Sequence, residues 1–215
     1  MISNKFFYSI LLFIALIKAI FLFCFVDGIK LWEDHNIAVN LLNTGTFFYE
    51  YDGIINHTYQ FPLYPFIVSL IYKAFGQNFH WVALFNLLIS TATCFVLIKT
   101  FEHILKYFNS EILTKYSQQI IYVSVFAFAL HPAIAYYALY NVHPFSLNLF
   151  FFFLVLYYGL FISEQVSVKL LLRYGLLMGI AMLDRATVIT ATIPFFLIVW
   201  KEKGFKNVLM PVLIT

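Results

Sequence analysis

Long apolar segments separated by short polar stretches run along most of the chain. Crossing ~30 Å of hydrocarbon takes about 20 helical residues. Four segments reach that length: Phe6–Val26, Phe79–Phe101, Tyr116–Leu139 and Pro144–Ile162. The pattern therefore predicts an all-α polytopic membrane protein. Within the third segment, His131–Pro132 predicts a kink, with His131 hydrogen-bonded to a neighbour.

Two shorter apolar segments follow. Leu170–Leu183 and Thr187–Trp200 are separated by Asp184 and Arg185, which predicts a pair of short helices that meet at a polar kink. With the four longer segments they make about six membrane helices. The sequence ends on the apolar run NVLMPVLIT, residues 207–215. We therefore expect the last membrane helix to be incomplete and the protein to be truncated.

The segment Ile29–Phe48, IKLWEDHNIAVNLLNTGTFF, is half polar although it follows a membrane helix. Its spacing predicts a helix over Glu33–Gly45, with Asp34 as N-cap and Gly45 as C-terminal stop. Polar and apolar positions fall on two stripes, as in a helix that lies on a membrane surface. The polar stripe is Glu33, Asn36, Asn40 and Asn43, and the apolar stripe is Ile37, Ala38, Leu41 and Leu42. Asp34 lies one turn before Ile37 and Ala38 and leads into the apolar stripe.

A further apolar segment, Pro62–Phe75, makes only about 21 Å of helix and is expected to lie in the membrane interface. The positive-inside rule then gives one consistent topology with a cytoplasmic N-terminus. The basic residues of the inner loops are Lys106, Lys115, Lys169, Arg173, Lys201, Lys203 and Lys206. We expect a single membrane domain over residues 1–215. It comprises a first membrane helix in 1–26, a large extracytoplasmic loop in 27–78 with juxtamembrane helices, and the remaining helices in 79–215.

Composition supports a membrane location and narrows the chemistry. The chain is 63% hydrophobic and only 11% charged, whereas soluble domains have about 25% charged residues. It has no basic stripe on a polar face, which argues against nucleic-acid binding. Cys24 and Cys94 both lie inside apolar segments, where small buried side chains are a better interpretation than a disulfide or a metal site.

Glu33 and Asp34 are the first candidates for chemistry. A carboxylate at the outer mouth of a membrane protein can accept a proton from a hydroxyl group or bind a divalent ion. Each also has a plainer interpretation, because Asp34 can cap the helix and Glu33 can be a solvated side chain. Arg185 is a candidate anion ligand, since an ionisable group at membrane depth suggests function. Its alternatives are an ion pair with Asp184 or extension to the surface.

Several motifs follow one another in an order that is known from one superfamily. They are Glu33, Ile37–Ala38, Gly45–Phe47, Pro62–Leu63–Tyr64–Pro65 and Phe75–Gly76, followed late in the chain by Gly179–Trp200, GIAMLDRATVITATIPFFLIVW. This order resembles the N-terminal catalytic half of glycosyltransferase superfamily C, in particular its polyprenyl-phosphate-sugar-dependent mannosyltransferase-like branch.

The resemblance implies an inverting transfer at the extracytoplasmic face of a bacterial plasma membrane. A sugar would move from a polyprenyl-phosphate donor, among membrane lipids, to a cell-envelope glycan, lipid or protein. Alignment on Ile37–Ala38 makes Glu33 the base and leaves Asp34 as the cap. Candidate ligands of the donor phosphate are Arg185, Lys18, Lys30 and Lys73, and candidate acceptor contacts are His143, Asn141 and Tyr64.

The chain departs from the superfamily at the turn between the third and fourth long segments. A second acid often stands there, whereas this chain has YNVHPF with Asn141 and His143. No cofactor is therefore assigned. If a divalent cation takes part, its ligand would be Glu33 or Asp34.

Two other classes of function remain open. A transporter or lipid flippase would have broken helices in corresponding halves, and Leu170–Trp200 supplies one such break. A non-catalytic membrane assembly subunit would agree with the short chain. Other membrane enzymes are disfavoured because the sequence contains no Gly-x-Ser-x-Gly, Ser-x-x-Lys or His-Glu-x-x-His motif.

Overall fold

A computed structural model describes residues 4–26, 28, 30–57, 61–106, 111–164 and 167–203. The apolar run at 207–215, on which the expectation of an incomplete last helix depends, lies outside these residues. The chain forms two compact units, one of residues 1–92 and 128–147 and the other of residues 93–127 and 148–215.

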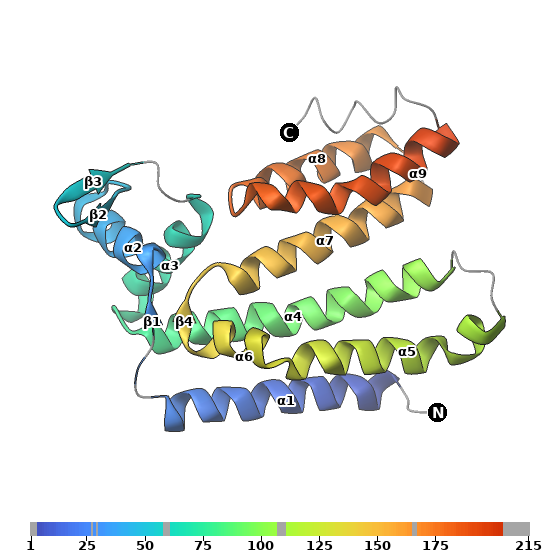
Figure 1. The fold of residues 1–215 in the computed structure, drawn as a ribbon, viewed down its shortest axis with the longest axis horizontal. Helices are drawn as coiled ribbons and strands as arrows, with labels where there is room; N and C mark the ends of the chain where they lie inside the picture. Colours follow the sequence, from blue (N-terminus) through green and yellow to red (C-terminus); the bar gives the residue numbers. More distant parts are fainter. Residues whose placement is uncertain are drawn as a thin grey trace. The chain divides into compact units, whose positions relative to one another are not determined.

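The first unit contains α1 (Asn4–Phe25), a loop region and the short helix α6. The loop region comprises β1 (Lys30–Leu31), α2 (Glu33–Thr44), β2 (Tyr49–Tyr51), β3 (Ile54–Asn56) and α3 (Leu63–Phe75). The unit also includes α6 (Pro132–Leu139) and β4 (Asn141–Val142). In Figure 1, α2 and α3 lie side by side and the β2–β3 hairpin flanks α2.

The second unit contains α7 (Phe145–Glu164), α8 (Val168–Met182), the 3-10 helix η1 (Ala186–Thr192) and α9 (Ile193–Lys203). Two more helices, α4 (Phe79–Lys106) and α5 (Glu111–Leu130), each contribute residues to both units, and the first three residues of α7, 145–147, also belong to the first unit. The predicted pair of short helices is confirmed as α8 and η1–α9, with Asp184 and Arg185 between them.

The helices make this an integral membrane protein. Among the described residues, three are long and apolar enough to cross a bilayer: Phe7–Phe25, Phe79–Leu105 and Phe145–Ile162. The pair α5–α6 makes a fourth candidate if it is one span bent by 47°. Since α8 has 15 residues and η1–α9 is also short, a total of six spans stays a prediction.

The bend between α5 and α6 confirms the kink predicted at His131–Pro132. Pro132 has no N–H to continue the helix, and His131 Nδ1 instead accepts a hydrogen bond from the Ala133 N–H at 3.2 Å. The Ala129 carbonyl lies in the last turn of α5, and it accepts a hydrogen bond from the Lys18 ammonium. A cation there also offsets the negative end of the helix dipole.

The helix α2 agrees with its predicted bounds and stop, because Gly45 adopts a left-handed conformation (φ 71°) that favours glycine. The predicted cap was wrong. Trp32 occupies the N-cap position, and Asp34 is the second helical residue. The apolar stripe packs on α3 within the protein, which leaves Ile37 and Ala38 fully buried. Whether α2 and α3 also lie on a membrane surface stays a prediction.

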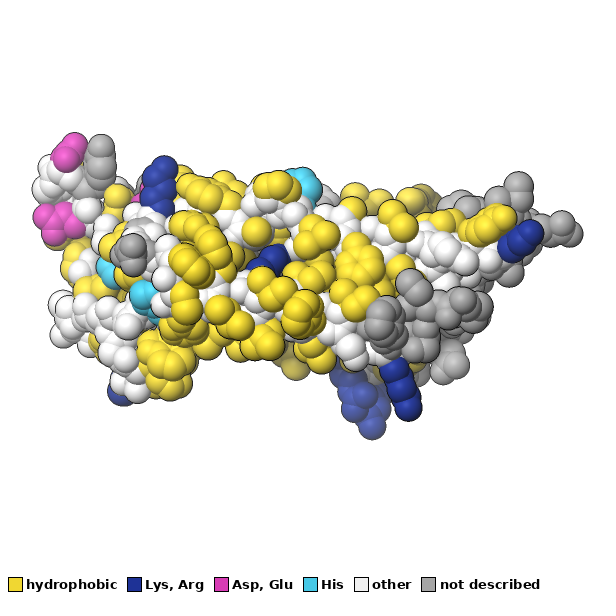
Figure 2. Space-filling model, turned by 90° about the horizontal axis from the view of Figure 1, so that it is seen from below, with side chains coloured by type: hydrophobic (Ala, Val, Ile, Leu, Met, Phe, Trp, Pro, Cys, Tyr) yellow, Lys and Arg dark blue, Asp and Glu magenta, His cyan; other side chains and the backbone are white. Residues whose placement is uncertain are grey.

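The β2–β3 hairpin was not predicted. Tyr51 pairs with Ile54, so Asp52 and Gly53 form a two-residue turn. Both have positive φ, 49° and 79°, as in the type I′ turn that suits a hairpin. The sequence carries the signal for this turn, since Asp-Gly stands between two strand-like triplets. Figure 2 shows acidic side chains gathered at the left of the view, the side on which Figure 1 draws this hairpin and α2.

A short parallel ladder ties the loop region to the α6–α7 turn. Lys30 pairs with Asn141 and Leu31 with Val142, and the Lys30 N–H donates to the Tyr140 carbonyl at 2.9 Å. Leu22 of α1 forms a buried cluster with Ala83 and Leu87 of α4, Leu139 of α6, and Val26, which follows α1 directly. The loop region is thereby fixed at one end of the membrane helices of this unit.

Within the second unit Gly159 of α7 lies close to Tyr174 of α8 and Phe195 of α9. A Cβ atom there would lie 2.8 Å from the Tyr174 hydroxyl and 2.9 Å from the Phe195 Cβ. We expect Gly159→Ala to lower the free energy of unfolding by about 1–3 kcal/mol through overpacking. Thermal unfolding in detergent measures this. The matched control Gly179→Ala, whose Cβ would meet nothing within 4 Å, should be neutral or stabilising, and an equal loss in both variants would contradict the packing argument.

Candidate functional site

Asp34 is a buried residue of the first unit. Its side chain is 2% exposed, whereas the neighbouring Glu33 is half-buried. The charge of Asp34 acts on the Tyr64 hydroxyl, which places the two groups close together. Burial and this carboxylate raise the pKa of Tyr64 well above its usual value, so the hydroxyl keeps its proton.

A hydrogen-bonded network extends from Tyr64. Its hydroxyl oxygen lies 3.2 Å from Oδ1 and 3.0 Å from Nδ2 of Asn86, and Asn86 Nδ2 also donates to the Asn141 carbonyl at 3.3 Å. Asn141 Oδ1 in turn accepts the Trp32 indole N–H at 2.9 Å, and its Nδ2 donates to the Tyr136 carbonyl. Tyr64, Asn86 and Asn141 are at most 1% exposed, so these residues hold the loop region to the membrane helices.

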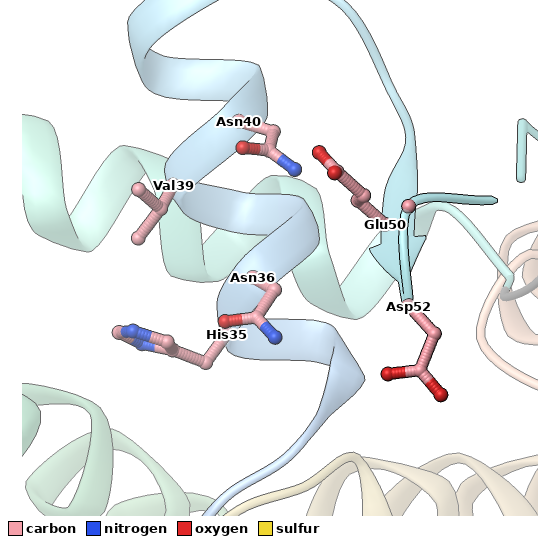
Figure 3. Close-up of a pocket in the computed structure, with 7 residues that line it drawn as sticks. His35, Asn36, Val39, Asn40, Glu50 and Asp52 are labelled. Carbon is pink, nitrogen blue, oxygen red and sulfur yellow. The ribbon is translucent and has the colours of Figure 1, made fainter. Parts of the chain in front are cut away.

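An open polar pocket of about 310 Å³ lies on the other side of α2. Its wall on α2 consists of His35, Asn36, Val39 and Asn40, and its wall on the hairpin consists of Glu50, Asp52 and Gly53. Figure 3 shows Asn36 and Asn40 pointing from α2 toward the hairpin that carries Glu50 and Asp52. The two walls are joined because Asn40 Nδ2 donates to the Phe48 carbonyl at 3.1 Å.

Glu33 belongs to the pocket side of α2 by its position. It precedes Asn36 by one helical turn and shares the predicted polar stripe with Asn36 and Asn40, both of which line the pocket. The rise of an α-helix puts its Cα about 4.5 Å along the axis from that of Asn36. The two adjacent acids therefore take different places, with Asp34 facing inward and Glu33 at the end of the pocket stripe.

His35 connects the pocket to α3. Its Nδ1 lies 2.7 Å from the Tyr72 hydroxyl, and partial burial lowers the pKa of the imidazole. Burial raises the pKa of Tyr72 to about 12. Both groups are therefore neutral at physiological pH, and His35 adds no positive charge to the pocket.

This lowered pKa predicts a pH dependence of stability. The unfolded chain protonates His35 near pH 6.5, whereas the folded chain does so at lower pH. Folding stability is therefore complete above about pH 6.5 and falls as the pH drops below it. Thermal unfolding at pH 7.5 and 5.0 should show a smaller decrease for His35→Gln than for the wild type. His57→Gln, at an exposed position of the hairpin, is the control, and a decrease unchanged in His35→Gln would contradict the assignment.

The candidate phosphate ligands are distributed over both units. Lys18 donates to the Ala129 carbonyl, a structural contact. Lys30 and Lys73 are exposed on the first unit, and the Lys30 ammonium lies 5.9 Å from the centre of the Trp32 ring. Arg185 is half-buried at the N-cap of η1 in the second unit.

The three candidate acceptor contacts, Tyr64, Asn141 and His143, lie close together in the structure. They belong to the buried hydrogen-bonded network and not to the pocket. Tyr64 and Asn141 use their polar atoms within it. His143 is half-buried, its Nδ1 accepts the Phe145 N–H at 3.2 Å at the start of α7, and its backbone hydrogen-bonds to Tyr64. These contacts favour a structural role for all three.

The pocket residues were missed as site candidates. Glu50 lies two residues before Asp52, which is the first residue of the Asp-Gly turn, and this local signal predicts two acids at one end of a hairpin. Asn36 gave no signal beyond its place on the polar stripe, and His35 gave none. Among the described residues, no group of three or more His, Cys, Asp or Glu side chains is placed to hold a metal ion, so no ligand set is assigned for a divalent cation.

Comparisons with known proteins leave the family open. No protein-family model matches the chain, and no curated protein or solved structure is significantly similar to it. The resemblance to glycosyltransferase superfamily C therefore stays a prediction from the sequence motifs.

Proposed function

We propose that this protein is a membrane glycosyltransferase. It moves a sugar from a polyprenyl-phosphate donor to a hydroxyl group of a cell-envelope glycan, lipid or protein, at the extracytoplasmic face of a bacterial plasma membrane. The observation that carries the proposal is the polar pocket on α2, fixed beside the membrane helices of the first unit. Glu33 stands one helical turn before Asn36, which lines this pocket.

The proposed step needs one base and one leaving group. The Glu33 carboxylate accepts the proton of the acceptor hydroxyl while that oxygen forms a bond to the anomeric carbon. The bond between that carbon and the phosphate oxygen breaks from the opposite face, so the configuration inverts and polyprenyl phosphate leaves with the electron pair. Glu33 then releases its proton to water.

Glu33 suits the base role better than Asp34. A base must come within hydrogen-bond distance of the proton that it accepts. Glu33 is half-buried and remains accessible, whereas Asp34 is 2% exposed and belongs with Ile37 and Ala38 to the buried residues of α2. We assign Asp34 a positioning role, in which it holds the start of α2 against α3.

The leaving phosphate requires positive charge or hydrogen-bond donors. Lys30 and Lys73 are the exposed candidates of the first unit. Arg185 is retained as a candidate on the sequence resemblance. Lys18 is the weakest of the four candidates, because its ammonium already donates a hydrogen bond to the Ala129 carbonyl near the end of α5.

The test is a transfer assay with purified protein in lipid vesicles. Radiolabelled polyprenyl-phosphate sugars are offered with a cell-envelope acceptor fraction, and we expect label on the acceptor with an equal amount of free polyprenyl phosphate. Passage of the intact donor across the bilayer would instead show a flippase. Absence of transfer and of donor cleavage, for the chain alone and for the complex purified from its native membrane, would contradict the proposal.

A further inference from the structure

The pocket between α2 and the hairpin offers both kinds of hydrogen-bonding group. The carboxylates of Glu50 and Asp52 only accept hydrogen bonds, and the carboxamide of Asn36 both donates and accepts. Figure 3 shows Asn36 and Asn40 opposite the hairpin acids across this space. A sugar hydroxyl is itself a donor and an acceptor of hydrogen bonds. Carboxylates on the hairpin and carboxamides on α2 can therefore bind neighbouring hydroxyl groups of one sugar.

The charge of the lining excludes the anionic donor. The lining residues include two acids, Glu50 and Asp52, and no Lys or Arg. Burial lowers the pKa of His35 and keeps it neutral at physiological pH. A phosphate group here would be repelled, whereas an uncharged polyol would not. A divalent cation is also less suited, because the lining supplies two carboxylates and the described residues contain no group of three metal-ligating side chains.

Size and rigidity point to a single sugar unit. The volume of about 310 Å³ is at the lower end of the range for small-molecule sites. The walls are held in place by the Asp52–Gly53 turn, by the bond from Asn40 to the Phe48 carbonyl and by the contact between His35 and Tyr72. A pre-organised site of this kind loses little entropy when it binds a small ligand.

We propose that this pocket binds one neutral, hydroxyl-rich sugar unit of the acceptor. Asn36, Glu50 and Asp52 hold its hydroxyl groups, and Glu33, one turn before Asn36, then lies toward the hydroxyl that reacts. The identification of this sugar as part of the acceptor rests on the proposed function. The binding of a neutral sugar by the pocket can be measured without any transfer.

The experiment is ligand-observed NMR with the full chain in lipid nanodiscs and no donor present. The probes are methyl glycosides of glucose, galactose, mannose and N-acetylglucosamine, with glucose 1-phosphate and Mg²⁺ as anionic and cationic comparisons. We expect at least one methyl glycoside to bind and glucose 1-phosphate not to bind. Glu50→Ala should weaken that binding about tenfold or more, the loss expected for a hydrogen bond to a charged group, and Asn36→Ala should weaken it to a smaller extent.

Asn43→Ala is the matched control. Asn43 is exposed on the same polar stripe but does not line the pocket, and Asn36 and Glu50 are exposed too, so none of the three changes disturbs the core. Absence of sugar binding, equal binding by the Glu50→Ala and wild-type proteins, or Mg²⁺ as the only ligand that depends on Glu50 would overturn the inference.

The inference and the proposed function fail in different ways. Transfer activity with an acceptor KM unchanged in Glu50→Ala would overturn the pocket assignment and leave the glycosyltransferase proposal intact. Pocket-dependent binding of a methyl glycoside without transfer would overturn the enzyme proposal and leave a sugar-binding membrane protein.

Discussion

Replacing Glu33 by Gln should lower the rate of sugar transfer by about 10²–10⁴-fold, the usual contribution of a general base. The amide has nearly the shape of the carboxylate but cannot accept the proton of the acceptor hydroxyl. An unchanged midpoint of thermal unfolding would exclude misfolding as the cause of the loss. Initial rates of transfer at saturating donor, with wild type and variant in the same vesicles, provide the measurement.

Two further variants make this result specific. Glu102→Gln removes a carboxylate from an exposed pair with Lys99 on α4, and its rate should equal that of the wild type. Asp34→Asn should lower thermal stability more than the transfer rate per folded molecule, since Asp34 is buried beside Tyr64. A full rate in Glu33→Gln with a large loss in Asp34→Asn would move the base to Asp34. Full rates in both would rule out a carboxylate base on α2.

Replacing Asn86 by Leu should give the largest loss of stability in the first unit. Asn86 is fully buried, and its amide meets both the Tyr64 hydroxyl and the Asn141 carbonyl. Leu fills a similar volume but leaves these two groups without this partner. A buried polar group that loses its partner costs about 1–3 kcal/mol, so we expect roughly 2–5 kcal/mol in total. The midpoint of thermal unfolding in detergent should fall accordingly.

A double substitution separates this network from general damage. In Asn86→Leu with Tyr64→Phe, the unpartnered hydroxyl is also removed, so the loss should be smaller than the sum of the two single losses. Asn43→Leu, at an exposed position of α2, should change stability by less than about 0.5 kcal/mol. Strict additivity of the two core substitutions would show that Tyr64 and Asn86 do not stabilise the fold through one another.

The sequence alone determined the features that depend on neighbours along the chain. Apolar length located α1, α4 and α7, because a helix must satisfy its own backbone within the hydrocarbon. Proline chemistry located the bend after His131, and the conformational freedom of glycine located the end of α2 at Gly45. The Asp52–Gly53 turn also depends only on neighbouring residues, and the Asp-Gly pair is sufficient to predict the hairpin.

The tertiary structure decided which polar residues are buried. Asp34 and Glu33 are adjacent and chemically alike, and only the packing of α2 on α3 directs one inward and leaves the other beside the pocket. Lys18 contacts the Ala129 carbonyl, and Trp32 contacts Asn141, each across more than a hundred residues. Neither contact leaves a periodic pattern in the sequence, because hydrogen bonds between distant segments are set by the fold that brings those segments together.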